Sequence, residues 1–325
     1  MVQLCPFASA APEISAKKAI LTDALSGQVL FERDADSKSL IASTTKILTA
    51  LIVCEQCDLS QVVRIPKEAV GVEGSSLYLR EGEMLTVEQL LYGLMLRSGN
   101  DAAVALALHC AGSIEAFAQM MNEKAAELGM KNSHFCNPHG LDGEDHYATA
   151  RDLSTLAVAA MENEQVRRIA STKSISFGER SLVNHNKLLW RCEGAVGIKT
   201  GYTKAAGRIL VSAAERNGRR LVCVSINDPN DWSDHSALLD FGYAQFVLRQ
   251  FAQPGQSLAQ VTLLGGEQVE LKAEAVFSYP LLPGETLELQ LICPAYAWGK
   301  EELEQAVMLV RLYGKEVGRI ALTTE

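Results

Sequence analysis

Long uninterrupted apolar stretches are absent from this chain of 325 residues. The longest candidates, residues 47–54 and 102–108, are far shorter than the roughly 20 apolar residues that a helix needs to cross a bilayer. The sequence therefore argues against an integral membrane protein, and we expect both stretches to form core helices. It also contains no internal repeat and no low-complexity tract.

An excess of positive charge is missing as well. Lys and Arg total 30 against 39 Asp and Glu, which gives a net charge of −9 and an isoelectric point near 5.3. Because such a surface repels phosphate, we expect no nucleic-acid partner. Hydrophobic residues at 48% and charged residues at 21% are instead typical of a folded globular protein, and the length predicts about two domains.

The eight cysteines do not predict a disulfide framework, because a chain of this size does not need one to fold. Most of them lie in apolar segments, and we expect buried free thiols. Cys54 and Cys57 form a C-x-x-C in the second half of a predicted helix, away from the N-terminus that would activate them. His134, Cys136 and His139 lack a fourth ligand at suitable spacing, so no metal site is expected.

The N-terminus carries Ala-Ser-Ala at residues 8–10, followed by Ala-Pro, which resembles the cleavage site of a secretory signal. The preceding seven residues are too few for an apolar signal region and include no basic residue. Residues 1–10 are therefore interpreted either as the remnant of a leader or as a disordered terminus.

Periodicity predicts sheet elements on either side of a helical middle. Strands are predicted at residues 18–24, 28–33, 207–215 and 219–226, and the last two are joined by the hairpin signal Asn217-Gly218. Helices are predicted at residues 43–57, in two pieces within 86–109 broken at 97–100, and at 113–128, 149–161 and 232–248. Thr86 with Gln89, and Thr149 with Asp152, resemble helix-capping pairs.

This order predicts an α+β fold in which an antiparallel sheet with helices carries an all-helical subdomain, over residues 11–250. After Pro254-Gly255 the composition shifts to short alternating runs separated by Gly and Pro. Residues 251–325 are therefore predicted to form a small all-β domain.

Residues 43–46, Ser-Thr-Thr-Lys, lie where a loop enters a predicted helix. Because an offset of three residues spans about one helical turn, Ser43 and Lys46 are expected on the same face. A lysine can take the serine proton only when it is neutral, which requires desolvation or a second cation nearby. The helix N-terminus adds N–H groups that can stabilise an oxyanion.

Ser-x-x-Lys is a weak signal by itself, since a chain of this length holds about one match by chance. Residues 15–18, Ser-Ala-Lys-Lys, are a second match. They lie at the start of a predicted strand, where an offset of three places the two side chains on opposite faces, so we discard them.

Two further elements complete a candidate site. Residues 98–100, Ser-Gly-Asn, interrupt two predicted helices and offer a hydroxyl for proton transfer and an amide for a peptide-like substrate. Residues 199–201, Lys-Thr-Gly, follow a strand-like run, and a cation there can bind a carboxylate and lower the pKa of a nearby amine. Residues 225–227, Ser-Ile-Asn, match the second element loosely but lie in an apolar strand and are interpreted as structural.

These three elements, in this order, are the signature of class A β-lactamases and penicillin-binding proteins. Residues 12–250 resemble a D-alanyl-D-alanine carboxypeptidase of the low-molecular-mass penicillin-binding protein type, whose fold is β-lactamase/transpeptidase-like. The residues that carry this resemblance are 41–46, 90–103, 137–141, 149–153 and 197–203. The tail from residue 255 resembles the family's small C-terminal domain less specifically.

The resemblance implies a mechanism with an acyl-enzyme. Ser43 would attack the carbonyl of the penultimate D-Ala in a peptidoglycan stem peptide ending in D-Ala-D-Ala, and Lys46 would take its proton. Ser98 would help to pass that proton to the departing D-Ala, and water would then release the shortened peptide. β-Lactam antibiotics would acylate Ser43 as covalent inhibitors because they mimic the substrate.

The resemblance also implies how the substrate is bound. Asn100 would hold the substrate amide, and Lys199 and Thr200 would bind the terminal carboxylate. Gly201 would admit the substrate backbone to the strand. The N–H of Tyr202 would form the oxyanion hole together with that of the nucleophile. No cofactor and no metal are implied.

Two other functions stay open on the residues alone. A β-lactamase shares the serine and the lysine but needs an efficient deacylation base, and Glu162 and Glu164 fall in the relevant interval without a recognisable loop context. A non-catalytic penicillin-binding module would be expected to lack part of the motif set, which is complete here.

The substrate implies a place of action outside the cytoplasmic membrane, in cell-wall peptidoglycan biosynthesis and cell-shape maintenance. Many members of the family end in an amphipathic helix that lies on the membrane. Residues 317–325 instead predict a last strand and a frayed end, so peripheral membrane association is left open.

Overall fold

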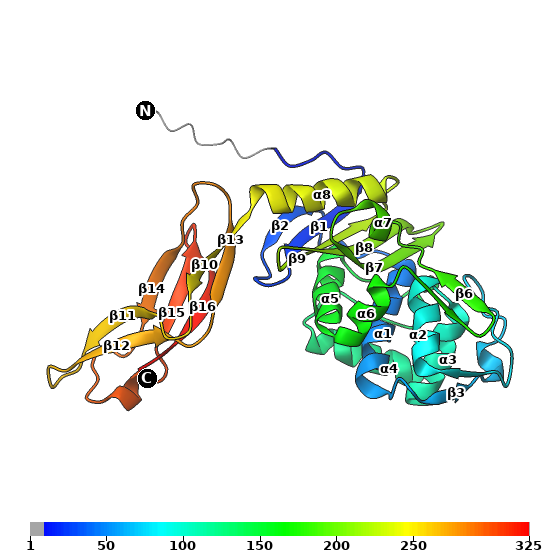
Figure 1. The fold of residues 1–325 in the computed structure, drawn as a ribbon, viewed down its shortest axis with the longest axis horizontal. Coiled ribbons are helices and arrows are strands. Elements are labelled where there is room, and N and C mark those ends of the chain that lie inside the picture. Colours follow the sequence, from blue (N-terminus) through cyan, green and yellow to red (C-terminus); the bar gives the residue numbers. More distant parts are fainter. Residues whose placement is uncertain (1–9, 325) are drawn as a thin grey trace. The chain divides into compact units, whose positions relative to one another are not determined.

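The computed structural model describes residues 10–324, so the predicted leader remnant lies outside the described residues except for Ala10. The chain divides into two compact units, one comprising Ala11–Ala24 and Val29–Gly242 and the other containing the chain from Tyr243 onward (Figure 1). No single helix among the described residues has the length and apolar composition to cross a membrane, although the bent pair Asn100–Ala111 and Ile114–Glu127 passes that test jointly.

The first unit is built on a five-stranded antiparallel sheet in the order β2-β1-β9-β8-β7. Its strands are β1 (Lys18–Asp23), β2 (Val29–Arg33), β7 (Ala195–Thr203), β8 (Gly207–Arg216) and β9 (Arg219–Ile226). Strand β7 lies at one edge of the sheet. The hairpin of β8 and β9 confirms the strands predicted from the Asn-Gly turn.

Helices cover both faces of this sheet (Figure 1). The helices of this unit are α1 (Lys46–Gln56), α2 (Val87–Leu96), α3 (Asn100–Ala111), α4 (Ile114–Glu127), α5 (Ala150–Glu162), α6 (Glu164–Ser171), α7 (Leu188–Arg191) and α8 (Asp231–Gln245). Of these, α2, α3 and α4 pack mainly on other helices. Helix α8 is fixed to one face by His235, which is hydrogen-bonded to Ser212 of β8 at 2.6 Å and Ser225 of β9 at 2.8 Å. Helix α5 packs on the opposite face, and the mixed α+β class is confirmed.

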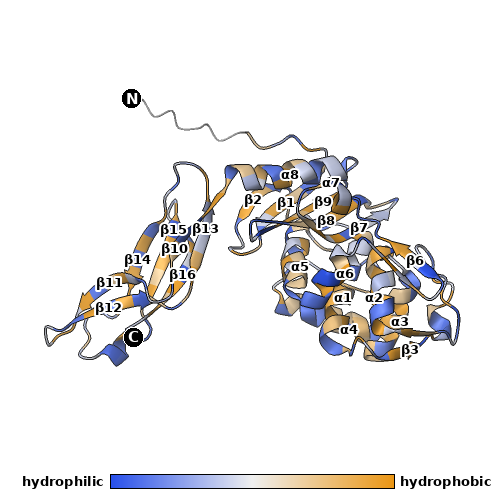
Figure 2. Cartoon of the chain, viewed as in Figure 1, coloured by the Kyte–Doolittle hydropathy of each residue, from blue (hydrophilic) through white to orange (hydrophobic). Residues whose placement is uncertain are grey.

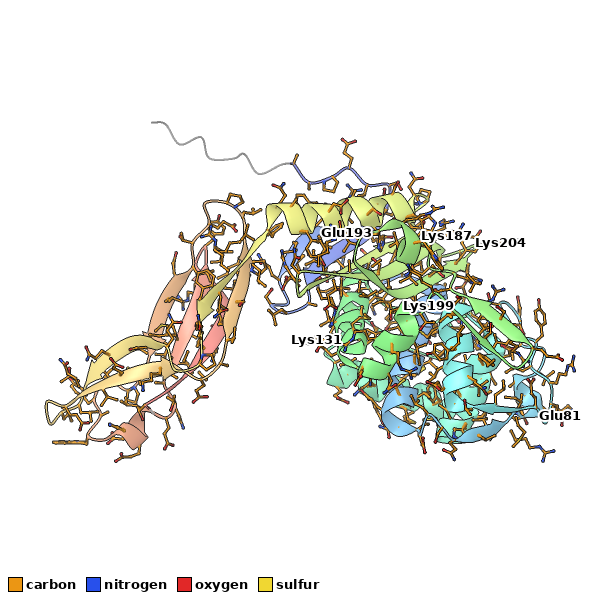
Figure 3. The ribbon with its side chains drawn as sticks, in the orientation of Figure 1. Glu81, Lys131, Lys187, Glu193, Lys199 and Lys204 are labelled. Atoms are coloured by element: carbon orange, nitrogen blue, oxygen red, sulfur yellow. The ribbon has the colours of Figure 1, made fainter. Side chains whose placement is uncertain are left out.

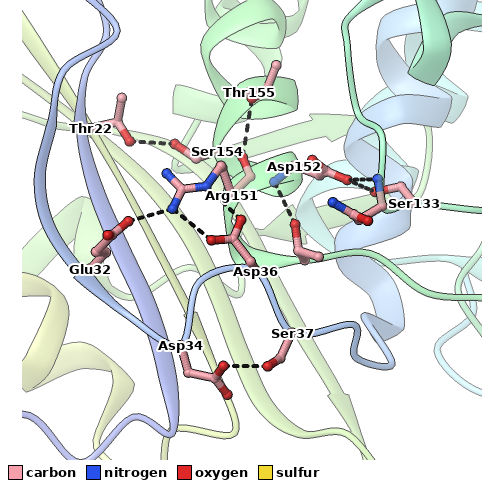
Figure 4. Close-up of polar contacts among 12 residues, drawn as sticks. Thr22, Glu32, Asp34, Asp36, Ser37, Ser133, Arg151, Asp152, Ser154 and Thr155 are labelled. Carbon is pink, nitrogen blue, oxygen red and sulfur yellow. Dashed lines mark hydrogen bonds and ion pairs between the residues drawn. The ribbon is translucent and has the colours of Figure 1, made fainter. Parts of the chain in front are cut away.

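Local sequence signals fix several helix starts. The Thr86 and Gln89 side chains form a reciprocal capping box at α2, as predicted. The Thr149 hydroxyl accepts a hydrogen bond from the Asp152 N–H at 3.0 Å, but the Asp152 carboxylate does not return to the cap. It instead accepts from the Asn132 N–H at 2.8 Å and the Ser133 hydroxyl at 2.7 Å, and thereby ties the loop before α5 to the helix (Figure 4).

Helix α5 is also joined to the sheet by polar contacts (Figure 4). The Ser154 hydroxyl donates to the Thr22 hydroxyl of β1 at 2.8 Å. The Arg151 guanidinium pairs with Glu32 at 2.5 Å and with Asp36 at 2.7 Å. These exposed ion pairs bridge α5 to the β2 side of the sheet.

Several predicted boundaries are wrong. The helix predicted at residues 43–57 starts with a 3₁₀ turn, η1 (Ala42–Thr45), and becomes α-helical only at Lys46. The helix predicted at 232–248 ends at Gln245, because Val247–Ala252 forms strand β10 against β13 (Phe277–Leu281). The Lys-Thr-Gly element lies within β7 instead of following the strand.

Short elements escaped prediction. They include α6, α7, the 3₁₀ turn η2 (Lys67–Ala69), and the small hairpins of β3 (Val62–Arg64) with β4 (Met84–Thr86) and of β5 (Ser174–Phe177) with β6 (Arg180–Val183). Strands of three or four residues are too short to show an alternation of period two.

Residues 247–324 of the second unit form only strands apart from the 3₁₀ turn η3 (Lys300–Leu303). Its strands are β10, β11 (Ser257–Thr262), β12 (Gln268–Ala273), β13 (Phe277–Leu281), β14 (Glu288–Ile292), β15 (Val307–Leu312) and β16 (Lys315–Thr323). They form a sheet in the order β11-β12-β16-β15-β14 and a two-stranded sheet of β10 and β13. Polar and apolar residues both occur along these strands (Figure 2), and Leu271 and Val310 are among those in the core.

Candidate active site

The turn before α1 presents Ser43 at the surface of a cleft. Ala42 has a φ of 45°, in the left-handed region, and places Ser43 in the 3₁₀ turn that leads into α1. Two buried hydroxyls secure this turn, since Thr44 donates to the Ile41 carbonyl at 2.6 Å and Thr45 donates to the Ala42 carbonyl at 2.9 Å. The nucleophile candidate is therefore held by hydrogen bonds on both sides.

A glycine on a neighbouring loop presses against the same turn. Gly140 has a φ of 89°, and a side chain there would collide with the Ala42 carbonyl and crowd the Thr45 hydroxyl. Only glycine lets the loop backbone come this close to the turn that carries Ser43.

Lys46 is fully buried and its amine has three partners. Its Nζ lies 2.9 Å from the Ser43 hydroxyl, 2.6 Å from Asn100 Oδ1 and 2.5 Å from the His139 carbonyl oxygen. The Asn100 amide is oriented by its Nδ2, which donates to the Glu73 carbonyl at 2.5 Å. The predicted proximity of Ser43 and Lys46 is therefore observed, and Asn100 contacts the lysine directly.

The surroundings of Lys46 disfavour its charged form. Burial lowers the pKa of Lys46 well below its usual 10.5, Lys199 lowers it further, and Asp101 acts in the opposite direction. A neutral amine has two N–H groups and one lone pair. Because the His139 carbonyl and Asn100 Oδ1 can only accept hydrogen bonds, they take both N–H groups, and the lone pair faces the Ser43 hydroxyl.

Ser98 supplies a second hydroxyl to the cleft. Its backbone has a φ of 62° at the break between α2 and α3, and its side chain is buried. Its Oγ has no hydrogen-bond partner among the described residues. A buried hydroxyl without a partner is costly, and Ser98 is therefore available to exchange a proton with a bound ligand.

Asp101, which the sequence did not single out, fixes one wall of the cleft. Its carboxylate accepts from the Ser76 hydroxyl at 2.6 Å and from the N–H groups of Leu77 at 2.8 Å and Leu79 at 3.2 Å. This holds the segment that follows Ser75, a residue lining the cleft. Asp101 is next to Asn100, but its acidic side chain gave no sequence signal for this role.

His146 supports the Ser43 turn from below. Its Nδ1 accepts from the Cys136 N–H at 3.1 Å, so its Nε2 carries the proton and donates to the Thr45 hydroxyl at 2.7 Å. Burial and the nearby His134 and Lys46 lower the pKa of His146 to about 4, so the ring stays neutral near pH 7.

Lys199, Thr200, Gly201 and Tyr202 lie on β7 beside the nucleophile turn. Lys199 is 1% exposed, lies between the sheet and the helices (Figure 3), and donates to the Thr200 carbonyl at 3.0 Å. Burial lowers the pKa of Lys199 to about 7. The open position of Gly201 faces the Ile41 carbonyl and Ala42, so the strand backbone runs close to the turn that carries Ser43.

A cleft of about 570 Å³ brings most of these residues together. It is lined by Ser43, Ser75, Ser98, His185, Thr200, Gly201, Tyr202, Arg208, Asp231 and Trp232. Lys46, Asn100 and Lys199 lie behind this surface. The sequence missed Ser75, His185, Arg208, Asp231 and Trp232. Arg208 lies on β8 directly opposite Tyr202 of β7, a strand pairing that the sequence did not predict.

Other candidate residues lie away from the cleft. Glu162 is exposed and pairs with Arg220 at 2.6 Å, and Glu164 begins α6, so neither lines the cleft. No group of three or more His, Cys, Asp or Glu in residues 10–324 is placed to hold a metal ion. Cys54 is a free thiol in α1, and burial raises its pKa to about 12, which makes it unreactive.

This arrangement, a serine hydroxyl beside a desolvated amine with a second hydroxyl in one cleft, is that of a serine hydrolase acting through an acyl-enzyme. Residues 6–230 match the family Peptidase_S11, D-alanyl-D-alanine carboxypeptidase. The chain is 33% identical over 287 residues to D-alanyl-D-alanine carboxypeptidase DacF of Bacillus subtilis, covering 84% of this chain and 74% of that protein.

Two further comparisons indicate the same family. DacB2 of Mycobacterium tuberculosis is 40% identical over 245 residues, with 72% of this chain and 84% of that protein covered. The crystal structure of penicillin binding protein 5 from Haemophilus influenzae superposes with a TM-score of 0.86 at 26% identity, over 98% of this chain and 99% of that one. The chain belongs to the D-alanyl-D-alanine carboxypeptidase family and is a serine-type carboxypeptidase of peptidoglycan.

Proposed function

We propose that Ser43 is the nucleophile that removes the terminal D-Ala from stem peptides, with Lys46 as its base. The observation that carries this proposal is the 2.9 Å contact between Lys46 Nζ and Ser43 Oγ, where burial and Lys199 lower the pKa of the amine and so favour its neutral form. Ser43 Oγ bonds to the carbonyl carbon of the penultimate D-Ala, and its proton passes to Lys46. The oxyanion is met by the N–H groups of Ser43 and Tyr202.

Collapse of this intermediate breaks the peptide C–N bond. The proton held by Lys46 reaches the departing D-Ala nitrogen through Ser98, whose hydroxyl is otherwise unpartnered. Asn100 holds Lys46 in place through its Oδ1, and the second N–H of its Nδ2 is left to hold the substrate amide. Water then attacks the ester carbonyl and gives a proton to Lys46. The bond between Ser43 Oγ and the acyl carbon breaks, and Lys46 returns the proton to Ser43 Oγ.

The remaining strand residues bind substrate. Thr200 meets the terminal carboxylate, with Lys199 buried behind it, and the Gly201 backbone lies along the peptide. A β-lactam follows the same path, with its ring amide opened by Ser43 to leave an acyl-enzyme. Because stem peptides belong to the cell wall, the enzyme acts outside the cytoplasmic membrane.

We further propose that residues 11–250 form the domain that carries the reaction and that residues 251–325 form a separate β-rich domain. The support is the position of the cleft, whose lining residues all precede residue 243.

The test compares Ser43→Ala with Ser181→Ala, an exposed serine outside the cleft. The wild-type protein and S181A should release D-Ala from a D-Ala-D-Ala-ended peptide and be labelled by fluorescent penicillin. S43A should lose both activities by at least about a thousandfold. Release of D-Ala by S43A, or penicillin on another residue, would contradict the proposal.

A further inference from the structure

Three cysteines lie near one another in the helical part of the first unit. Cys54 lies near the end of α1, Cys57 is the C-cap residue of that helix, and Cys110 lies in the last turn of α3. All three are free thiols and half-buried. None of them lines the cleft, so this group is separate from the catalytic residues.

Helices α1 and α3 run side by side in the same direction. Lys46 is the first residue of α1 and Asn100 the first residue of α3, and their side chains meet at 2.6 Å. The helices are 11 and 12 residues long, so each extends about 16–18 Å from that contact. Because they also pack on each other, their far ends are expected to meet as well.

The structure shows this second meeting point. The Cys110 thiol is hydrogen-bonded to the Cys57 sulfur. Beside it, His109 Nε2 lies 3.3 Å from Gln61 Oε1, which joins the same two helix ends a second time. Both thiols lie at helix ends, where side-chain rotation and small backbone movements can bring the sulfurs to the roughly 2.05 Å of an S–S bond.

We propose that Cys57 and Cys110 form a disulfide that joins the far ends of α1 and α3 when a disulfide donor is present. The donor is a small disulfide or a protein with a reactive disulfide. The bond encloses residues 57–110, restricts the unfolded chain and so stabilises the first unit. This inference uses the place of action proposed above, because disulfides persist outside the cytoplasm.

The bond forms by thiol–disulfide exchange in two steps. Cys57 loses its proton and its sulfur attacks the donor, whose S–S bond breaks and whose first thiolate leaves and takes up a proton. Cys110 then loses its proton and attacks the Cys57 sulfur, which releases the second donor thiolate. The two cysteines lose two protons and two electrons in total, and the donor gains them as two thiols.

The environment of Cys110 supports this order. Burial, together with the charge and hydrogen bond of Cys57, raises the pKa of Cys110 to about 12, so Cys110 is a poor attacking thiol while Cys57 is reduced. Once the Cys57 sulfur is bonded to the donor, it carries neither a charge nor a proton. Two of the three causes that raise the pKa of Cys110 are then removed.

Cys54 is the competing partner, because it lies one turn before Cys57 on α1 and interacts electrostatically with it. The hydrogen bond between the thiols favours Cys110 instead. Digestion with trypsin separates the two bridges, since Cys54 and Cys57 share the peptide 47–64 and Cys110 lies in the peptide 98–124.

The experiment uses the full-length protein, reduced, freed of reductant and incubated with oxidised glutathione. Remaining thiols are blocked with iodoacetamide, and the tryptic peptides are analysed by mass spectrometry without reduction. Peptides 47–64 and 98–124 should be joined through Cys57 and Cys110. By calorimetry, the oxidised protein should unfold at a Tm about 5–15 °C above that of the reduced protein.

Three variants locate the bond. Cys57→Ala and Cys110→Ala should each lose the joined peptides and the difference in Tm between oxidised and reduced protein. Cys54→Ala is the matched control on the same helix and should keep both. A bridge between Cys54 and Cys57, or glutathione adducts without joined peptides, would overturn the inference. Joined peptides without a rise in Tm would overturn its stabilising role.

Penicillin labelling of the same samples keeps this inference distinct from the proposed function. A wild-type protein that joins the two peptides but is not labelled at Ser43 would overturn the proposed function and leave the disulfide in place. A labelled wild-type protein whose Cys57 and Cys110 stay reduced in oxidised glutathione would overturn the disulfide alone.

Discussion

The first compact unit buries charged, imidazole, amide, serine and threonine side chains, whereas residues 243–324 bury none of these types. The core of residues 243–324 consists of apolar residues such as Leu271 and Val310. In the first unit the buried set includes two lysines, Lys46 and Lys199, together with Asn100 and His146. Both units fold around apolar cores, and only the first unit buries these polar side chains in addition to its apolar core.

The difference indicates that some polar side chains of the first unit, such as Lys46, are buried for their chemistry and not for stability. Burying a charge or an unpaired polar group costs free energy unless partners compensate for it. The partners of Lys46 come from the 3₁₀ turn η1, from α3 and from the loop at His139. The first unit accepts this cost at the cleft and also at packing contacts such as that of His235 with Ser212 and Ser225, whereas residues 243–324 bury no such groups.

The largest expected effect comes from removing the buried base. Lys46→Ala should slow acylation by a fluorescent penicillin about 10²- to 10⁴-fold, because a general base contributes that much to proton transfer. Lys46→Arg should be as poor, since its guanidinium stays protonated. Lys187→Ala, an exposed lysine, serves as the control and should react at the wild-type rate. Near-normal acylation of K46R would refute the role of the neutral amine.

A smaller effect is expected from replacing His146, which is hydrogen-bonded to Thr45 in the turn that carries Ser43. His146→Leu removes the partners of the Cys136 N–H and the Thr45 hydroxyl, and should lower the acylation rate about 10-fold while destabilising the protein by about 1–3 kcal/mol. His146→Gln can donate to Thr45 and should recover part of the rate. Stopped-flow acylation and urea unfolding measure the two effects. A variant that loses stability but acylates normally would leave His146 with only a structural role.

Replacing the second buried lysine, Lys199, should shift the pH dependence of acylation. Lys199→Met removes a positive charge that lowers the pKa of Lys46, so that pKa should rise. The acidic limb of the pH–rate profile for acylation should then move to higher pH by about one unit, which is about a tenfold loss on that limb. Lys204→Met, at an exposed position, is the control. A uniform loss at every pH would argue against this electrostatic effect.

Acid should lower the stability of the first unit more than that of the second. Burial lowers the folded-state pKa of His146 to about 4 and of His235 to about 3, from an ordinary 6.5, so below pH 6.5 the unfolded state binds protons first. Stability from these residues is full above pH 6.5 and falls as the pH drops toward 4. Asp228, whose pKa is raised to about 6, acts in the opposite direction but is a single group.

All six histidines precede residue 243, so residues 243–324 should not share this loss. Hydrogen exchange at pH 7 and pH 5, corrected for its intrinsic pH dependence, should show protection lost in the first unit alone. Equal loss in both units would contradict this prediction.

The smallest effect on activity is expected from the apolar core of the second unit. Leu271→Ala should destabilise that unit by about 2–4 kcal/mol, because it removes a fully buried side chain. Acylation should stay within about twofold of wild type, since no residue after 242 lines the cleft. The matched change Leu91→Ala in the first unit should reduce both stability and acylation. A large loss of acylation in L271A would show that the units are coupled.

Residues that act within one element were predictable from sequence. Ser43 and Lys46 are three residues apart, so local geometry brings them together even though a 3₁₀ turn replaces the first helical turn. The Thr86–Gln89 capping box was likewise readable, because all its atoms belong to four consecutive residues. The family resemblance then placed Ser98 and Lys199 with them.

Contacts between distant segments were not predictable. The His139 carbonyl reaches Lys46 across 93 positions, and its acceptor is a backbone atom that every residue carries. Asp231 meets Arg208 only because α8 begins where β8 begins, which depends on the packing of helix on sheet. The burial of Lys199 was equally invisible, since its motif gives the residue type and not its depth.

The contact of Gly140 with the Ala42 carbonyl limits how this enzyme can vary. Any side chain at that position displaces the turn behind the nucleophile, so escape from an inhibitor cannot begin there without loss of catalysis. Tyr202 is 65% exposed at the rim, and its side chain can be exchanged without moving that turn. Variants selected under drug pressure should therefore accumulate around the mouth of the cleft and spare its floor.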